Sequence, residues 1–150
     1  MADSDSSVRQ QLSELIFEYG AMLDDRRMEQ WLRLFAEELS YRVIMRNNLD
    51  RGEPFYLINE NRIRLTQRVQ AYREQSGEPS LHLMTNLIVA ADDREQVKAG
   101  AAALILRNGR IAFAGRYQFD CVKLGEHWKI QELLLSLEGE STPEIITTPV

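Results

Sequence analysis

The spacing of apolar residues predicts where the first helices of this 150-residue chain lie. From Val8, apolar residues recur every three or four positions as far as Leu23, which is typical of a helix with one buried stripe. The pair Asp24-Asp25 ends this pattern. A short second helix is expected from Met28 to Phe35, with Asp25 as its N-cap.

Alternating apolar and polar residues predict strands along the rest of the chain. The stretch SYRVIMRNN at 40–48 alternates as a strand, and Gly52 and Pro54 mark a loop after it. A third helix is predicted from about Asn59 to Glu74. Four longer strands follow, at Leu81–Ala91, Val97–Arg107, Ile111–Leu124 and His127–Leu137. The pair Asn108-Gly109 is typical of a two-residue type I′ turn, so these strands are expected to form consecutive hairpins.

This order of elements predicts the fold class. Helices gathered before a run of strands indicate an α+β domain, with the helices packed on a strongly curved antiparallel sheet. Residues 1–7 are rich in Ser and Asp, and we expect them to be disordered. Residues 8–150 are expected to form a single domain.

Composition excludes several classes of function. The net charge of −5 does not favour a nucleic-acid partner held through phosphates. No apolar run reaches the roughly 18 residues that a membrane span needs. The N-terminus has neither a basic start nor an apolar segment, so it does not predict a secretory signal. We therefore expect a cytoplasmic protein without a membrane partner.

The chain carries few metal-binding side chains of the softer kinds. It has one cysteine, Cys121, and two histidines, His82 and His127. Iron–sulfur clusters need four cysteines, or two cysteines with two histidines, so this chain cannot hold one. A mixed histidine–carboxylate site remains open. The sequence motifs of zinc proteases, P-loop and dinucleotide-binding proteins and serine hydrolases are absent.

Two polar residues lie within a strand that is otherwise apolar. His82 and Asn86 are an even number of positions apart, so a regular strand places them on one face, about 13 Å from each other. At that separation they cannot form a catalytic dyad. His82 is then either an acid or base in a pocket, or a structural residue over the core or at a subunit contact.

The element order resembles the cone-shaped fold of nuclear transport factor 2-like and ketosteroid-isomerase-like proteins. Residues 41–74 resemble the small (beta) subunit of Rieske-type aromatic-ring-hydroxylating dioxygenases. The matching pairs are Tyr41 and Val43, Arg46 and Asn48, Gly52 and Pro54, Arg68 and Val69, and then His82 and Asn86. The end of the chain, Pro149-Val150, also fits. Leu81 and Gln67 depart from the pattern, where the family usually has Arg and Asp.

The resemblance implies a chain without catalytic or metal-binding residues and without a cofactor of its own. Its partners would be two further copies, giving a homotrimer, and an alpha subunit, giving α3β3. That alpha subunit would carry a Rieske [2Fe–2S] cluster and a mononuclear Fe(II), and would hold the ring substrate, which this sequence does not identify. The interface and structural candidates are Tyr41, Arg46, Asn48, Arg68, His82, Asn86, Ile145 and Ile146. We expect Ile145, Ile146 and Val150 to dock onto a neighbouring chain or back across the sheet.

An alternative function is a stand-alone isomerase, dehydratase or hydrolase of the same fold. Such an enzyme needs a carboxylate base near a tyrosine, and the candidates here are Tyr19, Asp24, Tyr41 and His82. Helix capping accounts for Asp24 and Asp25 without any pocket, and on that interpretation the chain has no catalytic site.

Overall fold

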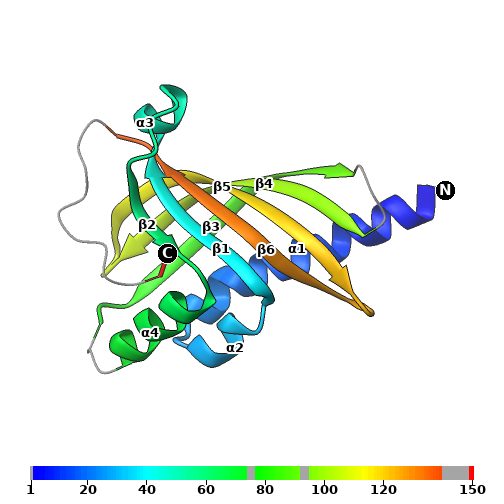
Figure 1. The fold of residues 1–150 in the computed structure, drawn as a ribbon, viewed down its shortest axis with the longest axis horizontal. Helices are drawn as coiled ribbons and strands as arrows, with labels where there is room; N and C mark the ends of the chain where they lie inside the picture. The colour runs from blue at the N-terminus through cyan, green and yellow to red at the C-terminus, as the bar shows by residue number, and fades with distance from the viewer. Residues whose placement is uncertain (1, 74–76, 92–94, 140–148) are drawn as a thin grey trace.

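The computed structural model describes residues 2–73, 77–91, 95–139 and 149–150. The helices are α1 (Ala2–Asp24), α2 (Met28–Leu32), α3 (Arg46–Asp50) and α4 (Arg62–Arg73). The strands are β1 (Phe35–Met45), β2 (Tyr56–Glu60), β3 (Ser80–Ala91), β4 (Gln96–Arg107), β5 (Arg110–Leu124) and β6 (His127–Leu137). One curved sheet carries α1 across one face, and α2 and α4 lie beside one end of it (Figure 1). This is the α+β arrangement that the element order predicts.

Helix α1 is longer than the apolar pattern predicts. It begins at Ala2 rather than Val8, so the expected disorder of residues 1–7 is wrong from Ala2 onward. The predicted apolar stripe is confirmed, because its members Leu12, Leu15, Ile16, Tyr19 and Leu23 are all buried.

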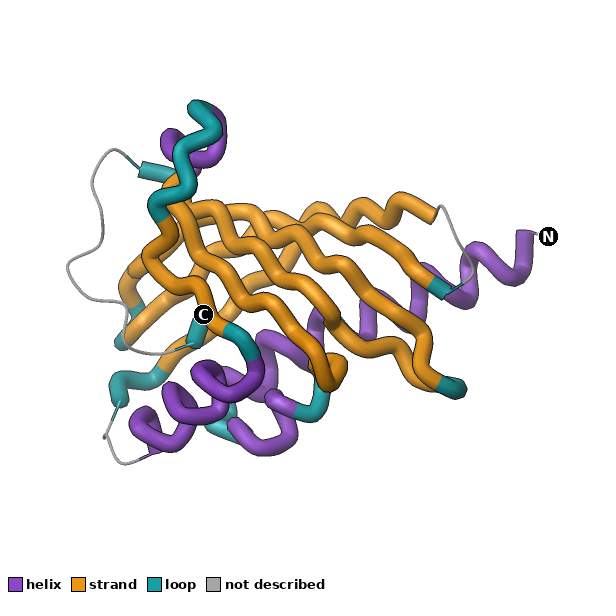
Figure 2. The backbone as a smooth tube through the Cα atoms, in the orientation of Figure 1, coloured by secondary structure: helices purple, strands orange, loops and turns teal. Residues whose placement is uncertain are grey.

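The sheet has six strands in the order β2-β1-β6-β5-β4-β3. Strands β3 to β6 form the predicted consecutive hairpins, and Asn108 and Gly109 have the positive φ angles of the predicted type I′ turn. The predicted antiparallel sheet is confirmed for four of the five strand pairings, and β1 pairs with β6 in parallel. Figure 2 shows β1 and β6 side by side in the middle of the sheet.

The region between β1 and α4 also departs from prediction. Strand β1 ends at Met45, and residues predicted to extend it form α3 instead; Asn47 and Asn48 have low strand propensity. Strand β2 was not predicted, because it has only five residues and the last two fall within the helix predicted from about Asn59. Helix α4 then begins after Asn61, whose side chain accepts a hydrogen bond from the Arg64 amide at 3.0 Å and caps the helix.

Helix α2 ends sooner than expected. Phe35 belongs to β1, and the residue before α2 is Arg27, which makes no side-chain cap, so the prediction of Asp25 as N-cap is wrong. The Asp25 carboxylate instead lies exposed, 3.4 Å from the Arg27 guanidinium.

Aromatic rings fill the core between α1 and the inner face of the sheet, meaning the face toward α1. Tyr19 of α1 lies at their centre, with ring centroids 5.6 Å from Trp31, 5.6 Å from Tyr117 and 5.7 Å from Phe119. Tilted and edge-to-face contacts of this kind add to the energy of burial. Cys121 is buried beside them as a small apolar residue, and burial raises the pKa of its thiol to about 12.

Candidate functional site

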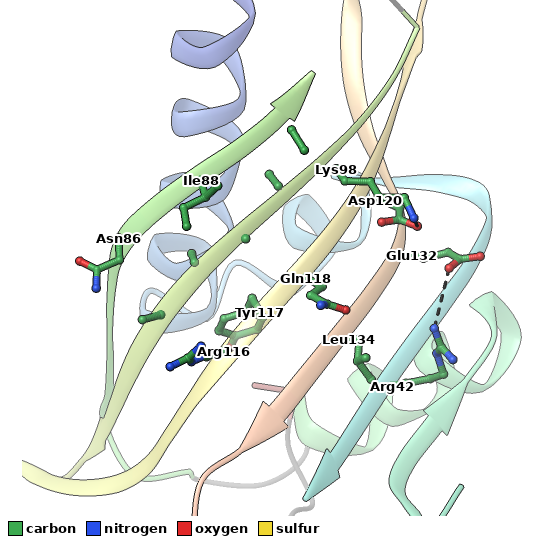
Figure 3. A pocket seen from close by; sticks show the side chains of 15 residues that line it. Arg42, Asn86, Ile88, Lys98, Arg116, Tyr117, Gln118, Asp120, Glu132 and Leu134 are labelled. Atoms are coloured by element: carbon green, nitrogen blue, oxygen red, sulfur yellow. Dashed lines mark ion pairs between the residues drawn. The ribbon is translucent and has the colours of Figure 1, made fainter. Parts of the chain in front are cut away.

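Polar side chains gather at two places, and the first is the outer face of the sheet, away from α1. A hollow of about 680 Å³ lies there, floored by the small residues of β4 between Ala99 and Ala102. Charged residues of both signs line it, and Arg42 and Glu132 of the neighbouring strands β1 and β6 pair at one end of it at 3.8 Å (Figure 3). The hollow therefore suits a surface that carries both charges, rather than an anion or a cation alone.

Large apolar side chains lie exposed beside this hollow. The outer aliphatic patch consists of Leu81, Leu83, Ile88 and Leu104, which are 51, 47, 70 and 41% exposed. Leu83 and Leu104 face each other across β3 and β4, so the patch is continuous from one strand to the next. Strand β3 is also an edge strand, with one side free of sheet pairing. Exposed apolar surface at a sheet edge is typical of an interaction site.

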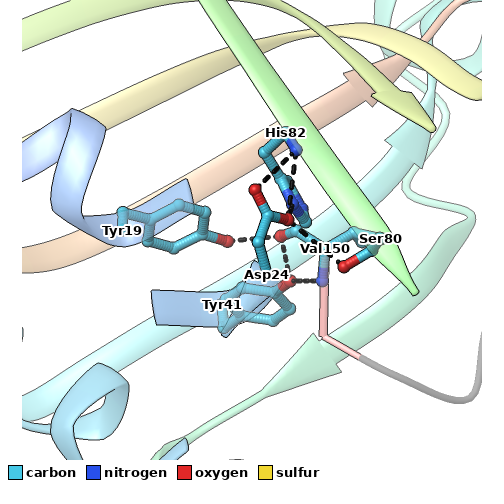
Figure 4. A network of polar contacts seen from close by, with 6 residues as sticks. All are labelled: Tyr19, Asp24, Tyr41, Ser80, His82 and Val150. Carbon is cyan, nitrogen blue, oxygen red and sulfur yellow. Dashed lines mark hydrogen bonds and ion pairs between the residues drawn. The ribbon is translucent and has the colours of Figure 1, made fainter. Parts of the chain in front are cut away.

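The second place is the interior, where Asp24 meets His82. Asp24 is the last residue of α1, and His82 lies on the inner face of β3. The Asp24 Oδ1 and His82 Nδ1 atoms are 2.6 Å apart, and the Asp24 carboxylate also accepts the His82 backbone amide at 2.9 Å (Figure 4). Ser80 Oγ donates to the same carboxylate at 3.2 Å. Capping does not account for Asp24, whose carboxylate joins α1 to β3.

Gly20 allows this contact. A Cβ at position 20 would lie 3.0 Å from His82 Cβ and 3.5 Å from Met84 Cγ, so any side chain there would press against β3. Glycine lets the last turn of α1 lie directly on the strand. One turn later, Asp24 is then within reach of His82.

Two tyrosine hydroxyls in the same region hold the backbone of Val150. Tyr41 donates to the Val150 carbonyl oxygen at 2.6 Å and accepts the Val150 amide at 2.8 Å, and Tyr19 donates to the same carbonyl oxygen. Val150 is 1% exposed and belongs to the core, although it lies outside any helix or strand. Figure 4 shows Tyr19, Asp24, Tyr41, His82 and Val150 converging from α1, β1, β3 and the end of the chain.

Burial controls the electrostatics of this interior site. Desolvation raises the pKa of Tyr41 to about 12, and hydrogen bonding to Val150 opposes part of that rise. Burial likewise raises the pKa of Tyr19 and of Tyr117 well above its ordinary value. All three phenols are therefore neutral hydrogen-bond donors at neutral pH.

Three buried polar atoms around the site have no hydrogen-bond partner among the described residues. They are His82 Nε2, Tyr117 Oη and Trp31 Nε1. Buried polar atoms are nearly always paired, so a cluster of unpaired ones is uncommon. Val150 thus satisfies only part of the polar surface that surrounds it.

The sequence-based alternative set of Tyr19, Asp24, Tyr41 and His82 is thus brought together in space. What the sequence did not reveal is that Asp24 contacts His82, and that Val150 occupies the position between the tyrosines. The sequence did indicate that the two tyrosines need a hydrogen-bond partner. Tyr19 and Tyr41 occupy positions on the apolar faces of their elements, and buried hydroxyls are nearly always hydrogen-bonded.

Asn86 does not share a face with His82, so that expectation is wrong. The pairing of β3 with β4 shifts between Thr85 and Ile88, and Asn86 has a φ of 53°. This β-bulge turns Asn86 outward to the hollow and restores Leu87 to the inner side. Arg9 of α1 donates to the Leu87 carbonyl at 3.1 Å, next to the bulge.

The remaining candidates lie apart from the interior site. Arg46 contacts Asp50 at 2.8 Å, which raises the pKa of Arg46, and it also lies 3.6 Å from Glu138. Asn48 is half-buried in α3, and its carbonyl accepts the Glu53 amide at 2.9 Å. Arg68 pairs with the buried Glu60 at 2.6 Å. Ile145 and Ile146 lie outside the described residues, so their docking stays a prediction.

No group of three or more His, Cys, Asp or Glu residues is placed to hold a metal ion, within the part of the chain that the structure describes. Over the same residues, no helix has the length and apolar character to cross a membrane.

The architecture is a nuclear transport factor 2-like fold. An NTF2-like protein with a cystatin-like fold from Novosphingobium aromaticivorans superposes with a TM-score of 0.67 at 16% identity, covering 86% of this chain and 80% of that one. The chain belongs to the ring hydroxylating beta subunit family, whose model matches residues 20–140.

Individual relatives agree with this family. The chain is 26% identical over 132 residues to the beta subunit of 3-phenylpropionate/cinnamic acid dioxygenase of Photorhabdus laumondii, covering 75% of this chain and 73% of that protein. It is also similar to the crystal structure of the beta subunit of a candidate aromatic-ring-hydroxylating dioxygenase from Novosphingobium aromaticivorans. That structure has a TM-score of 0.87 and 26% identity, and covers 97% of this chain and 99% of the other.

Proposed function

We propose that this chain is the non-catalytic beta subunit of a multicomponent oxygenase that hydroxylates aromatic rings during aromatic compound catabolism. In this proposal it forms a homotrimer and supports three alpha subunits in an α3β3 assembly. The Rieske cluster and the mononuclear iron belong to the alpha subunit. The family match supports this role, as does a sequence with one cysteine and two histidines, too few to bind the cluster.

The outer aliphatic patch is the observation that carries the proposal of assembly. Four large aliphatic side chains of two neighbouring strands lie in water in the single chain. Covering them removes apolar surface from water, at roughly 25 cal/mol per Å². Leu81 belongs to this patch, at the position where the family usually has Arg, so here the contact would be apolar rather than polar.

The hollow beside the patch supports the same interpretation. The small residues at its floor permit close approach of another chain. The residues at its rim carry charges of both signs, which can orient that chain. Lys98 and Asp120 are 4.0 Å apart there, and Lys98, whose side chain is 76% exposed, is available to a partner. Charged rims of this kind favour correct pairing more than raw affinity.

The assembly is tested with the double variant Leu83→Asp/Leu104→Asp. Light scattering of the purified wild-type chain should give the mass of a trimer, and the variant should give a monomer with an unchanged circular dichroism spectrum. Ile63→Asp is the matched control, because Ile63 is 69% exposed on α4, a different element, and should leave the trimer intact. A wild-type chain that stays monomeric at every concentration would contradict the proposal.

Association with the alpha subunit is tested by co-expression with a Rieske-type chain from the same genome. The expected product is a brown hexamer with ring-hydroxylating activity, whereas the beta chain alone is colourless and inactive. If the alpha chain is equally stable, soluble and active without this chain, the supporting role is refuted.

The alternative of a stand-alone isomerase, dehydratase or hydrolase is less well supported. Its candidate residues do converge, but the Val150 carbonyl uses the Tyr19 and Tyr41 hydroxyls that a reacting group would need. Asp24 is similarly engaged by His82 and Ser80.

A further inference from the structure

Residues 46–55, the α3 projection, consist of α3 and the turn that leads from it to β2. Figure 1 shows α3 at the end of β1, standing clear of the sheet. None of the residues of the projection is buried. Ordering a segment costs conformational entropy, and here the burial of its own side chains does not offset that cost. The projection therefore gains little from the core of its own chain.

Polar contacts hold the α3 projection in one shape. The Arg46 guanidinium contacts Asp50 at 2.8 Å, and it lies 3.6 Å from Glu138, just beyond the end of β6. The Glu53 amide donates to the Asn48 carbonyl at 2.9 Å and closes the turn after the helix. A shape that is fixed before binding reduces the entropy lost when a partner binds.

The α3 projection presents an aromatic ring to water. Phe55 is 66% exposed, and Arg51 and Pro54 are exposed beside it. Aromatic residues and arginine are enriched at protein interfaces. The composition of the projection is therefore that of a contact surface.

The floor of the hollow on the outer face leaves room for such a ring. Gly100 lines the hollow, and a Cβ there would lie 3.6 Å from the Tyr117 carbonyl oxygen, which is an ordinary contact distance. The packing of the chain itself therefore does not require glycine at this position. Glycine inside a strand often marks a place where another chain approaches closely. Ala102, the next residue on the same side of β4, lines the hollow as well.

The accessible charges of the two surfaces correspond. At the hollow, the side chains of Lys98 and Glu132 are 76% and 51% exposed. On the α3 projection, the Asp50 side chain is 58% exposed, and Arg51 is exposed next to it. Each surface thus offers a cation and an anion, so a contact between them allows charges of both signs to pair.

Threefold symmetry requires that two different surfaces meet. In a cyclic trimer each interface is heterologous, so the surface that one copy offers differs from the surface that it contacts. In the proposed homotrimer, the hollow and the outer aliphatic patch therefore face another surface of the same chain. The α3 projection has the exposed ring, the fixed shape and the charges that such a surface needs.

We propose that the α3 projection of one copy enters the outer hollow of the next copy, with Phe55 lying over the floor at Gly100 and Ala102. Three such contacts close the ring of three chains. This inference rests on the proposed homotrimer, and it names the surfaces through which the trimer forms.

The variant Phe55→Asp tests the projection. It should raise the concentration at which half of the trimer dissociates by at least about thirtyfold, which is the usual effect of losing a central interface residue, and should leave the circular dichroism spectrum unchanged. Phe17→Asp is the matched control, because Phe17 is 52% exposed on α1, and it should leave the trimer intact. Equal trimer stability of Phe55→Asp and wild type would overturn the inference.

Cross-linking identifies the two surfaces directly. Chains carrying Arg51→Cys are co-expressed with chains carrying Ala102→Cys, and the purified trimer is treated with a short bismaleimide. Cys121 stays unreactive, because it is buried and its thiol pKa is raised to about 12. The expected product is a covalent dimer that joins one chain of each kind.

The other outcomes of this experiment separate the inference from the proposed function. A trimer that gives no mixed dimer, or one that joins two chains carrying Ala102→Cys, would overturn the α3 contact and leave the homotrimer standing. A wild-type chain that is monomeric at every concentration would overturn the homotrimer and the contact together.

Discussion

Asp24 and His82 are 58 positions apart, and their side chains meet at 2.6 Å between Oδ1 and Nδ1. The contact joins the end of α1 to the edge strand β3, and Asp24 also accepts the His82 backbone amide. A single carboxylate thus fixes both the strand and the imidazole. This relationship supports the first prediction, on folding stability.

Replacing Asp24 with Ala should lower the free energy of unfolding by about 2–4 kcal/mol, because the buried imidazole and the strand amide both lose their partner. Asp25→Ala is the control, since Asp25 is the exposed neighbour and contacts only Arg27. Urea denaturation followed by circular dichroism gives both values. Equal stabilities of the two variants would mean that the contact contributes nothing.

Gly20→Ala should destabilise the protein by about 1–3 kcal/mol, although alanine favours helices more than glycine does. The added methyl group presses on His82 Cβ, which cannot yield while Asp24 holds the strand. Ala21→Gly, at an exposed position of the same helix, should cost only about 1 kcal/mol. A Gly20→Ala variant that is more stable than wild type would show that α1 can move away from β3.

Asn86→Val should destabilise the protein by about 1–2 kcal/mol, whereas Asn86→Gly should be nearly neutral. The reason is the φ of 53° at the bulge, which asparagine and glycine adopt readily and a β-branched residue does not. Thr85→Val lies on the same exposed side of β3 and serves as control, with a change below about 0.5 kcal/mol. Thermal melts of the three variants compare them directly.

Glu60→Ala should lower the free energy of unfolding by about 2–4 kcal/mol, because Glu60 is buried and contacts Arg68 at 2.6 Å. Arg64→Ala removes a contact to the same carboxylate at 3.3 Å, but the Arg64 side chain is 69% exposed and water screens the pair. That variant should change stability by less than about 0.5 kcal/mol. If Arg64→Ala lowered stability more than Glu60→Ala, the assignment of Arg68 as the structural partner of Glu60 would be refuted.

Stability should fall above pH 9, because Cys121 and the three buried tyrosines resist ionisation in the folded state. Cys121 and Tyr41 have folded pKa values of about 12 against ordinary values of 9.0 and 10.0. The stabilisation that each group provides is complete at pH values below its pKa in the unfolded chain. It is lost as the pH rises from that value to the pKa in the folded protein, at about 1.4 kcal/mol per pH unit for each group. Tyr41→Phe removes one of these groups, so between pH 10 and 12 the free energy of unfolding should fall less steeply, by about 1.4 kcal/mol per pH unit. Urea denaturation at each pH measures this slope.

Most elements were predicted correctly from the sequence, because a long run with a regular apolar period is compatible with only one type of secondary structure. Strands β3 to β6 have such runs, and the apolar stripe of α1 is continuous. Strand β2 and helix α3 were missed because five residues are too few to establish a period. The parallel pairing of β1 with β6 was also missed, since periodicity assigns faces to a strand but does not name its neighbour.

The interior site was predictable only in part. Tyr19 and Tyr41 occupy apolar positions of their elements, and this placed them inside the core. The partner of Asp24 depends on the path of α1 across β3, which is set by the absence of a side chain at Gly20. Likewise, the β-bulge at Asn86 adds one residue to β3 and so reverses which of the following residues face inward. The local sequence pattern did not predict this bulge.

The position of β6 has a consequence for the order of folding. Strands β1 and β2 are joined to the rest of the sheet only through β6, which is the last strand to leave the ribosome. Until β6 is made, neither the β1–β2 pair nor strands β3 to β5 can complete the sheet, because each pairs with β6. Completion of the fold is therefore a late and long-range event.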